Sequence, residues 1–261
     1  MLLARLLRMD EIVSVRVPTI TQEAARDLVR AREDVRGDLM PARHRVSKLP
    51  LRHGHVYYGG RAWTAKHATW LRSIRFAESG TQTAYEADRE AVDFALLRRD
   101  RLDKDIAAMA ADSEFTPVTR RLCCLRGIST LTGFALAVEI GDWDRFTGAS
   151  IGAYLGLVPT EHSSGQSRHQ RGITKTGNTH ARRLLIEAAW HHKARHTVGA
   201  VMRERWDQAP PAARVRGHEG NQRLNHRWAT YTARKKTHTV ANTAIARELA
   251  GWRWSLATMP E

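Results

Sequence analysis

The stretch that decides the fold runs from Leu122 to Trp190 and reads LCCLRGISTLTGFALAVEIGDWDRFTGASIGAYLGLVPTEHSSGQSRHQRGITKTGNTHARRLLIEAAW. An apolar segment interrupted by glycines is followed by a Ser-Ser-Gly turn, then by a basic loop, and then by an amphipathic helical pattern. Such a layout suits a helical module that grips a phosphate backbone and places a hydroxyl group beside it.

The charge of the whole chain favours the same kind of partner. Its 261 residues include 42 Lys and Arg against 27 Asp and Glu, which gives a formal net charge of +15. This length allows one large domain or two small ones, and the basic balance favours a polyanionic partner, nucleic acid first. The alternative is a solvated basic surface, or a coding bias toward arginine.

Two adjacent cysteines, Cys123 and Cys124, are the only ones in the chain. Neighbouring cysteines form a disulfide only with strain, and two thiols alone make a poor zinc site. We interpret them as small apolar residues of a buried segment, which fits the reducing cytoplasm. The longest apolar run, near Leu131–Ile140, is too short to span a bilayer, so no membrane partner is expected.

Apolar and polar residues alternate over Ile12–Val17, and Pro18 ends the pattern. This alternation predicts a short β-strand, the only convincing one in the sequence. A lone strand leaves its backbone groups without partners. We therefore expect that the chain begins partway through a domain whose other strands are missing.

The pattern after this strand is helical. Thr21 can cap a helix that runs to about Arg36, after which Pro41 and Pro50 predict a kinked or broken helix. The next segment, His53–Trp70, is rich in glycine and aromatic residues, and it is predicted to be a loop that ends in a short helix.

A long helix is predicted over Thr81–Asp112. Its apolar residues recur at intervals of seven and four, the spacing of a coiled-coil seam. The seam consists of Ala84, Ala91, Ala95, Leu102, Ile106 and Met109. Two interpretations stay open: a helix that dimerises with a second copy, and an amphipathic helix that packs on the core of its own domain.

The C-terminal half is also predicted to be helical, which makes the fold class mainly α. The expected helices are Val118–Arg126, Thr132–Ile140, Phe146–Tyr154 and His180–His196. Pro159–Asn178 is expected to be a polar loop, and Gln208–Gln222 a flexible linker. A last helical region follows, with apolar residues from Leu224 to Trp254.

The residues from Leu125 to Gly133 (LRGISTLTG) have the layout of a helix-hairpin-helix module. In that module a glycine such as Gly127 lets the backbone approach a phosphate, and the next helix, here near Thr130, presents free N–H groups. Such contacts position DNA without reading its sequence. The alternative is an ordinary glycine-capped turn between helices, since the chain has Gly-Ile-Ser in place of the usual Gly-Ile-Gly.

Hydroxyls, glycines and cations are interleaved from Glu161 to Asn178, a composition that can bind several phosphates. A serine hydroxyl is a weak nucleophile that needs a nearby base, metal or cationic field before it attacks phosphorus. The alternative is a flexible linker in which the serines are ordinary turn residues. The candidate nucleic-acid contacts of the chain are Gly127, Thr130, Arg168, Arg171, Lys175, Asn178, Arg182 and Arg183.

His192 and His196 lie one turn apart in a predicted helix, a spacing that suits a metal ion. However, Lys193 and Arg195 would repel a cation, and no acid lies between the two histidines. We therefore expect solvated or phosphate-facing histidines and no metal site.

Three pieces of the chain, GISTLTGFALAVEIGDWDRF, AYLGLVPTEHSSG and RGITKTGNTHARRLLIEAA, follow one another in a familiar order and spacing. They closely resemble the C-terminal domain of the IS110/IS116/IS902 family of bacterial insertion-sequence transposases. The segments RDLVRAREDVRGDLMPARHRVSKLPLRHG and AWTAKHATWLRSIRF resemble the linker of that family. The resemblance therefore covers nearly all of the chain.

The resemblance implies a serine nucleophile in the C-terminal domain, which attacks DNA and forms a covalent phosphoserine link. That serine falls on Ser164, directly before a glycine, with Ser163 as the fallback. In the complete family enzyme an RNase H-like domain supplies Asp, Glu, Asp and Asp to bind Mg²⁺. The implied partners are DNA, a guide RNA, and further protomers or a full-length transposase.

Those acids precede the part of the family that this chain resembles, so the chain itself is expected to bind no cofactor. We expect a truncated transposase that does not act alone; whether it is an enzyme stays open. The alternatives are a non-catalytic DNA- or RNA-binding protein that modulates intact transposase, and a remnant without a role. The expected domains are an RNase H-like α/β remnant (1–20), a helical linker (21–80), the long helix (81–113), the C-terminal transposase domain (117–200) and a basic helical extension (201–261).

Overall fold

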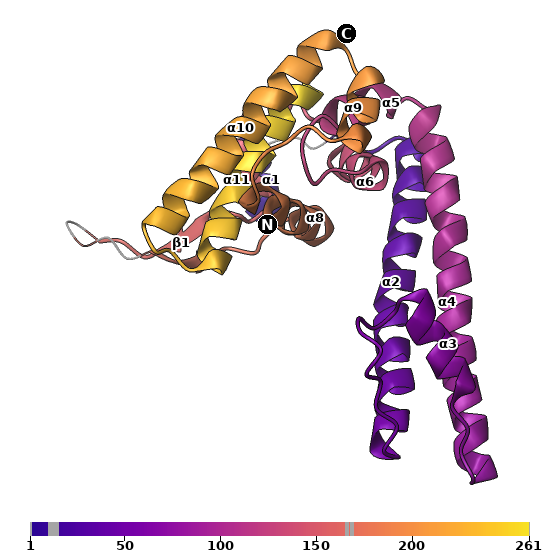
Figure 1. Cartoon of the computed structure of the whole chain (residues 1–261). Helices are drawn as coiled ribbons and strands as arrows, with labels where there is room; N and C mark the ends of the chain where they lie inside the picture. The colour runs from indigo at the N-terminus through magenta and orange to yellow at the C-terminus, as the bar shows by residue number, and fades with distance from the viewer. Residues whose placement is uncertain (1, 10–15, 165–166, 168–169, 261) are drawn as a thin grey trace. The chain divides into compact units, whose positions relative to one another are not determined.

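The computed structural model describes residues 2–9, 16–164, 167 and 170–260 (Figure 1). Over this part of the chain the fold is mainly α, with a single two-stranded sheet, which confirms the predicted fold class. The helices are α1 (Leu2–Arg8), α2 (Ile20–Arg52), α3 (Ala65–Ser73), α4 (Ser79–Ala111), α5 (Thr116–Leu122), α6 (Thr130–Ile140), α7 (Ser150–Tyr154), α8 (Thr179–Ala189), the 3₁₀ helix η1 (Trp190–Lys193), α9 (Ala200–Asp207), α10 (Pro211–Ala233) and α11 (His238–Ala257). The strands are β1 (Pro159–Glu161) and β2 (Gln170–Ile173).

The chain divides into two compact units. The smaller unit is Asp27–Ile106, and the larger unit combines Met1–Arg26 with Ala107–Glu261. None of the helices that the structure describes is long and apolar enough to cross a membrane. The predicted N-terminal strand lies mostly outside the described residues, and its last two residues, Arg16 and Val17, have no strand structure.

The smaller unit is built on α2 and α4, which run antiparallel in it. Two ion pairs fix this direction, because Arg32 meets Asp103 at 2.7 Å and Arg45 meets Asp88 at 2.8 Å. The core between the helices contains Leu39, Ala42, Val46, Leu71, Ile74, Tyr85, Val92 and Ala95.

The predicted long helix is confirmed as α4, and its apolar stripe faces the core of its own unit. Tyr85 is fully buried, and its hydroxyl donates a hydrogen bond to the carbonyl oxygen of Leu71 at 2.7 Å. Val92 and Ala95 are also buried, whereas Ala84 of the expected seam is exposed. These contacts support the interpretation of α4 as an amphipathic helix on its own core.

Of the two predicted outcomes at the prolines, the broken helix is wrong, because α2 continues through both Pro41 and Pro50, and the kinked helix stays a prediction. The proline ring fixes φ near the helical value, so the main loss is a hydrogen bond and some steric fit, about 3 kcal/mol for each proline. Burial of Leu39, Ala42 and Val46 on the same helix offsets this cost.

The predicted linker at Gln208–Gln222 is also wrong, because most of it belongs to α10. Pro211 occupies the start of this helix, where its missing N–H costs nothing. The glycines serve close packing: a Cβ at Gly217 would lie 2.5 Å from the Cβ of Cys124, and one at Gly220 would lie 3.0 Å from Trp252. Glycine therefore marks a tight helix contact here and not a flexible segment.

The predicted polar loop at Pro159–Asn178 contains an antiparallel hairpin of β1 and β2, in which Pro159 pairs with Ile173. The sequence shows no alternation here, and the side chains of the hairpin that the structure describes are exposed or only partly buried. The predicted helix His180–His196 is shorter than expected, since α8 ends at Ala189 and η1 follows it.

The core of the larger unit joins α5, α6, α8, α10 and α11 around fully buried side chains such as Leu125, Leu136, Leu185, Trp228 and Ile245. The predicted buried segment is confirmed at Cys123 and Cys124, which are free, buried thiols. Burial raises the pKa of Cys123 to about 11 and that of Cys124 to about 12, so both stay protonated.

Two glycine substitutions should change stability in opposite directions. Gly217→Ala should lower the free energy of unfolding by about 1–3 kcal/mol, because the new Cβ overlaps Cys124. Gly37→Ala, in α2, meets nothing within 4 Å and should raise it by about 0.5–1 kcal/mol through helix propensity. Urea denaturation followed by circular dichroism measures both, and a stabilised Gly217→Ala variant would contradict the packing role.

Candidate nucleic-acid interface and serine site

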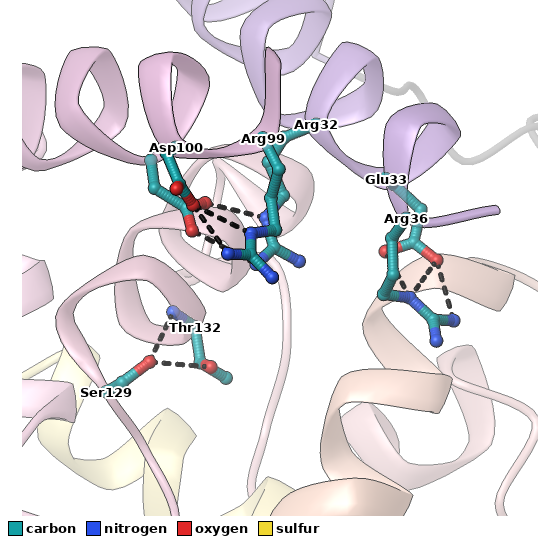
Figure 2. Close-up of polar contacts among 8 residues, drawn as sticks. Arg32, Glu33, Arg36, Arg99, Asp100, Ser129 and Thr132 are labelled. Atoms are coloured by element: carbon teal, nitrogen blue, oxygen red, sulfur yellow. Dashed lines mark hydrogen bonds and ion pairs between the residues drawn. The ribbon is translucent and has the colours of Figure 1, made fainter. Parts of the chain in front are cut away.

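The turn between α5 and α6 holds two of the predicted nucleic-acid contacts. The Ser129 hydroxyl caps α6 by accepting a hydrogen bond from the Thr132 backbone N–H at 3.2 Å (Figure 2). Thr130 is exposed in the first turn of this helix. Gly127 has a φ of 81°, and a Cβ there would lie 2.5 Å from the carbonyl oxygen of Ala188. The absent side chain of Gly127 therefore lets this turn pack against α8.

The two candidate nucleophiles lie at the far end of the β1–β2 hairpin. The backbones of Ser164 and Ser167 exchange two hydrogen bonds of 3.1 Å, which close a tight turn. The Ser163 hydroxyl donates to the Glu161 carboxylate at 2.8 Å, whereas the Ser164 side chain has no hydrogen bond with the described residues. Both serines are exposed, and Arg168 of the predicted contacts lies outside the described residues.

The return from the hairpin to α8 carries Lys175 and Asn178. Lys175 is exposed and has a φ of 57°, an uncommon conformation for a residue with a side chain. Asn178 is the N-cap of α8, and its Oδ1 accepts a hydrogen bond from the Ala181 N–H at 2.9 Å. A Cβ at Gly177 would overlap the carbonyl oxygen of Tyr154, so the loop passes directly over α7.

Arg182 and Arg183 differ in environment, although they are neighbours in the sequence. The Arg182 residue is only 9% exposed, and its guanidinium donates to the carbonyl oxygens of Leu155 at 3.1 Å and Thr176 at 2.7 Å. It thereby ties the loop to α8 and turns its N–H groups inward. Arg183 pairs with Glu187 at 2.6 Å on the outer face of the helix.

A buried carboxylate supports this loop, and the set of candidate residues did not include it. The side chain of Glu139 is 1% exposed and accepts a hydrogen bond from Asn178 Nδ2 at 2.8 Å. It also contacts His180 Nδ1 at 3.1 Å. The sequence held one signal for this role, since Glu139 is the only charged residue in the longest apolar run. A buried acid requires such partners.

A groove with a volume of about 1020 Å³ lies beside the base of the hairpin. Strand β2 and its return loop, α7, α10 and α11 all contribute to its lining. Its charged and aromatic residues are Arg171, Lys175, Arg216, Arg227, Tyr231, Arg247, Glu248, Trp252 and Trp254. Of these, sequence reasoning had identified only Arg171 and Lys175.

The histidines after α8 differ in exposure: His191 is exposed, whereas His192 does not follow the predicted solvated arrangement. His192 is 1% exposed, and burial, followed by the charge of Arg126, lowers its pKa to about 3. The 3₁₀ turn of η1 draws this ring inward, so the expectation of a solvated His192 is wrong. Among the residues that the structure describes, no group of three His, Cys, Asp or Glu side chains could hold a metal ion.

Removal of the buried carboxylate should be costly, whereas removal of an exposed one should not. Glu139→Ala leaves Asn178 and His180 without their acceptor and should lower the free energy of unfolding by about 2–4 kcal/mol. Glu187→Ala removes an exposed ion pair and should cost less than about 0.5 kcal/mol. Urea unfolding of both variants tests this, and equal losses would contradict the anchoring role of Glu139.

The neutral, buried His192 should make stability fall as pH falls. Above the ordinary histidine pKa of 6.5, His192 is uncharged in both the folded and the unfolded chain. Between pH 6.5 and about 3, only the unfolded chain binds the proton, which lowers stability by up to about 1.4 kcal/mol per pH unit. Urea unfolding between pH 7 and 5 should therefore show a smaller slope for His192→Gln, with the exposed His226→Gln as an unchanged control.

The sequence of this chain is similar to those of bacterial transposases. The sequence model of the Transposase IS116/IS110/IS902 family matches residues 119–207. The chain is 36% identical over 256 residues to the y4qE protein of Sinorhizobium fredii, a transposase by name. That match covers 98% of this chain and 62% of the Sinorhizobium protein, so the chain spans less than two thirds of that relative's length.

Two further relatives carry insertion-sequence names. The transposase for insertion sequence element IS1533 of Leptospira borgpetersenii is 25% identical over 238 residues, which covers 90% of this chain and 69% of that protein. A 43.6 kDa protein of insertion element IS110 from Streptomyces coelicolor is 31% identical over 152 residues, 58% of this chain and 31% of that protein. The chain is therefore a relative of the transposases of the IS116/IS110/IS902 family, whose domain it carries at residues 119–207.

Proposed function

We propose that this chain acts in DNA transposition, and that Ser164 is its nucleophile. The observation that supports this best is the exposed serine turn at the end of a hairpin whose base lines a cationic groove. The kinship with insertion-sequence transposases supports DNA as the substrate. A DNA substrate in turn suggests that the chain works in the cytoplasm.

The proposed reaction is a transesterification. The Ser164 oxygen bonds to a phosphorus atom of the DNA backbone, one P–O bond of the strand breaks, and the released sugar oxygen takes a proton. Because one phosphodiester replaces another, the step needs no external energy source and can run backward to rejoin strands. The hydroxyl must lose its proton to a base, and a cationic surrounding favours the charge that develops on the phosphate.

Exposed cations near the base of the hairpin would hold the DNA backbone. The side chains of Arg171 and Lys175 make no hydrogen bond or ion pair with the described residues, so their charges are available to phosphates. Thr130 and the N-terminus of α6 offer a second contact. We do not include Arg182 in the phosphate-binding set, because carbonyl oxygens already occupy its guanidinium.

Mg²⁺ is implied for the complete family enzyme, but the described residues of this chain do not fit it. They contain no group of three potential ligands, so no step of the proposed reaction passes through a metal bound here. We propose by resemblance that a guide RNA and further protomers, or a longer transposase, complete the assembly. A non-catalytic DNA- or RNA-binding role is the second candidate, which the same lack of a ligand group favours.

Serine substitutions in this chain test the proposal in a transposition assay. Ser164→Ala should reduce transposition from a donor plasmid by about 100-fold or more, because the nucleophile is lost. Ser163→Ala should retain activity within a few fold, and so should the matched control Ser167→Ala. In the presence of a longer transposase, a covalent protein–DNA adduct, visible on a denaturing gel, should form with the native chain and disappear only in Ser164→Ala.

The outcomes separate the candidates. Loss of the adduct in Ser163→Ala alone would move the chemistry to that serine. Full transposition by Ser164→Ala and Ser163→Ala would contradict a nucleophile in this turn. Tight DNA binding by the native chain, without adduct or transposition even beside a longer transposase, would favour the non-catalytic role.

A further inference from the structure

The lining of the groove beside the hairpin includes small residues as well as long side chains. Gly148, Gly152 and Gly251 are among the small ones, and Gly251 approaches Gly148 so closely that a Cβ would sit 3.2 Å from its carbonyl oxygen. Larger side chains at these positions would fill the space. The volume of about 1020 Å³ is at the upper end of the range for small-molecule pockets, which suits a few nucleotides and not a double helix.

Two arginines of α10 that line the groove lie over aromatic rings and form two arginine–aromatic layers. The Arg216 guanidinium lies 4.2 Å from the centre of the Trp252 ring, and that of Arg227 lies 5.0 Å from the centre of the Tyr231 ring. Hydrogen bonds hold both in place, from Arg216 to the Ser255 hydroxyl at 3.2 Å and from Arg227 to the Tyr231 hydroxyl at 2.8 Å. These layers are flat, cationic surfaces of the kind on which nucleobases stack.

The remaining cations are free to meet an anion. Arg171, Lys175 and Arg247 line the groove, and their side chains make no hydrogen bond or ion pair with the residues that the structure describes. The acid of the groove, Glu248, is already matched by Arg223 at 3.0 Å and Arg227 at 3.2 Å. The groove thus offers positive charge for several phosphates beside stacking surfaces for bases.

We propose that this groove binds a single strand of nucleic acid, with phosphates on Arg171, Lys175 and Arg247 and bases against the Arg216–Trp252 and Arg227–Tyr231 layers. A duplex satisfies the charges alone, because its base faces are covered by their neighbours. Only an unpaired strand uses both features. The proposal rests on the proposed function, since it names the form of nucleic acid that binds next to the β1–β2 hairpin and its proposed nucleophile, Ser164.

Fluorescence anisotropy with fluorescein-labelled dT20 and with a 20-base-pair duplex tests the groove in the full chain. At equal salt, dT20 should bind about tenfold more tightly than the duplex. Trp252→Ala should weaken dT20 binding by about tenfold and duplex binding by less than twofold, whereas Trp252→Phe should retain most of it. The matched aromatic control is Trp190→Ala, a partly exposed tryptophan that does not line the groove.

A charge reversal gives a second test of the groove, and this test does not alter a partly buried side chain such as Trp252. Arg247→Glu, at an exposed position of the groove, should weaken dT20 binding by about tenfold or more and lower the salt dependence of binding. Arg203→Glu, an equal charge change at an exposed position outside the groove, should change it by less than twofold. Circular dichroism confirms that each variant is folded.

Equal affinity for dT20 and the duplex, or equal effects of Arg247→Glu and Arg203→Glu, would overturn the proposal. These results are distinct from a failure of the proposed function. If Ser164→Ala loses the adduct while the groove variants bind dT20 as the native chain does, the assignment of Ser164 as the nucleophile stands and the strand-binding groove is overturned. If Ser164→Ala still forms the adduct while the groove variants weaken dT20 binding as expected, the strand-binding groove stands and the assignment of Ser164 is overturned.

Discussion

The buried carboxylate of Glu139 joins α6 to the first turn of α8, and the loop that carries the candidate contacts depends on this junction. Asn178 donates to it while capping α8, and His180 contacts it from the same turn. Arg182 reinforces the arrangement from the opposite side, through the carbonyl oxygens of Leu155 and Thr176. A buried carboxylate stabilises such a junction only when all its hydrogen-bond partners are present, because an unpaired buried charge is costly. The return strand of the hairpin is therefore fixed at its base.

Helical periodicity revealed most of the fold, and the errors occurred where one residue type has two uses. The prolines of α2 and the glycines of α10 both read as interruptions in the sequence. In the structure, buried neighbours compensate for the prolines, and Gly217 permits close contact with Cys124. Local patterns do not distinguish a glycine that bends the chain from one that admits a neighbouring helix. That difference depends on the partner, which lies 93 residues away in the case of Gly217.

The candidate site shows the same limit. The order of serines, glycines and cations from Glu161 to Asn178 was sufficient to select Arg171 and Lys175, which line the groove. It could not show that Arg182 faces inward, because burial depends on where α7 lies. Nor could it show the groove residues from α10 and α11, since Arg216 and Trp252 come together only through the packing of these two helices.

The β1–β2 hairpin leads away from the helices of the larger unit (Figure 1), and the serines that the structure describes near its end, Ser163, Ser164 and Ser167, are exposed. Its serine turn is therefore positioned by strand length and backbone pairing, not by a packed core. One residue added to each of the two strands would move the turn about 3.3 Å farther from the helices, and the helices themselves would not change. The reach of the hydroxyl is thus an adjustable dimension, and related chains can differ in hairpin length without rebuilding the scaffold beneath.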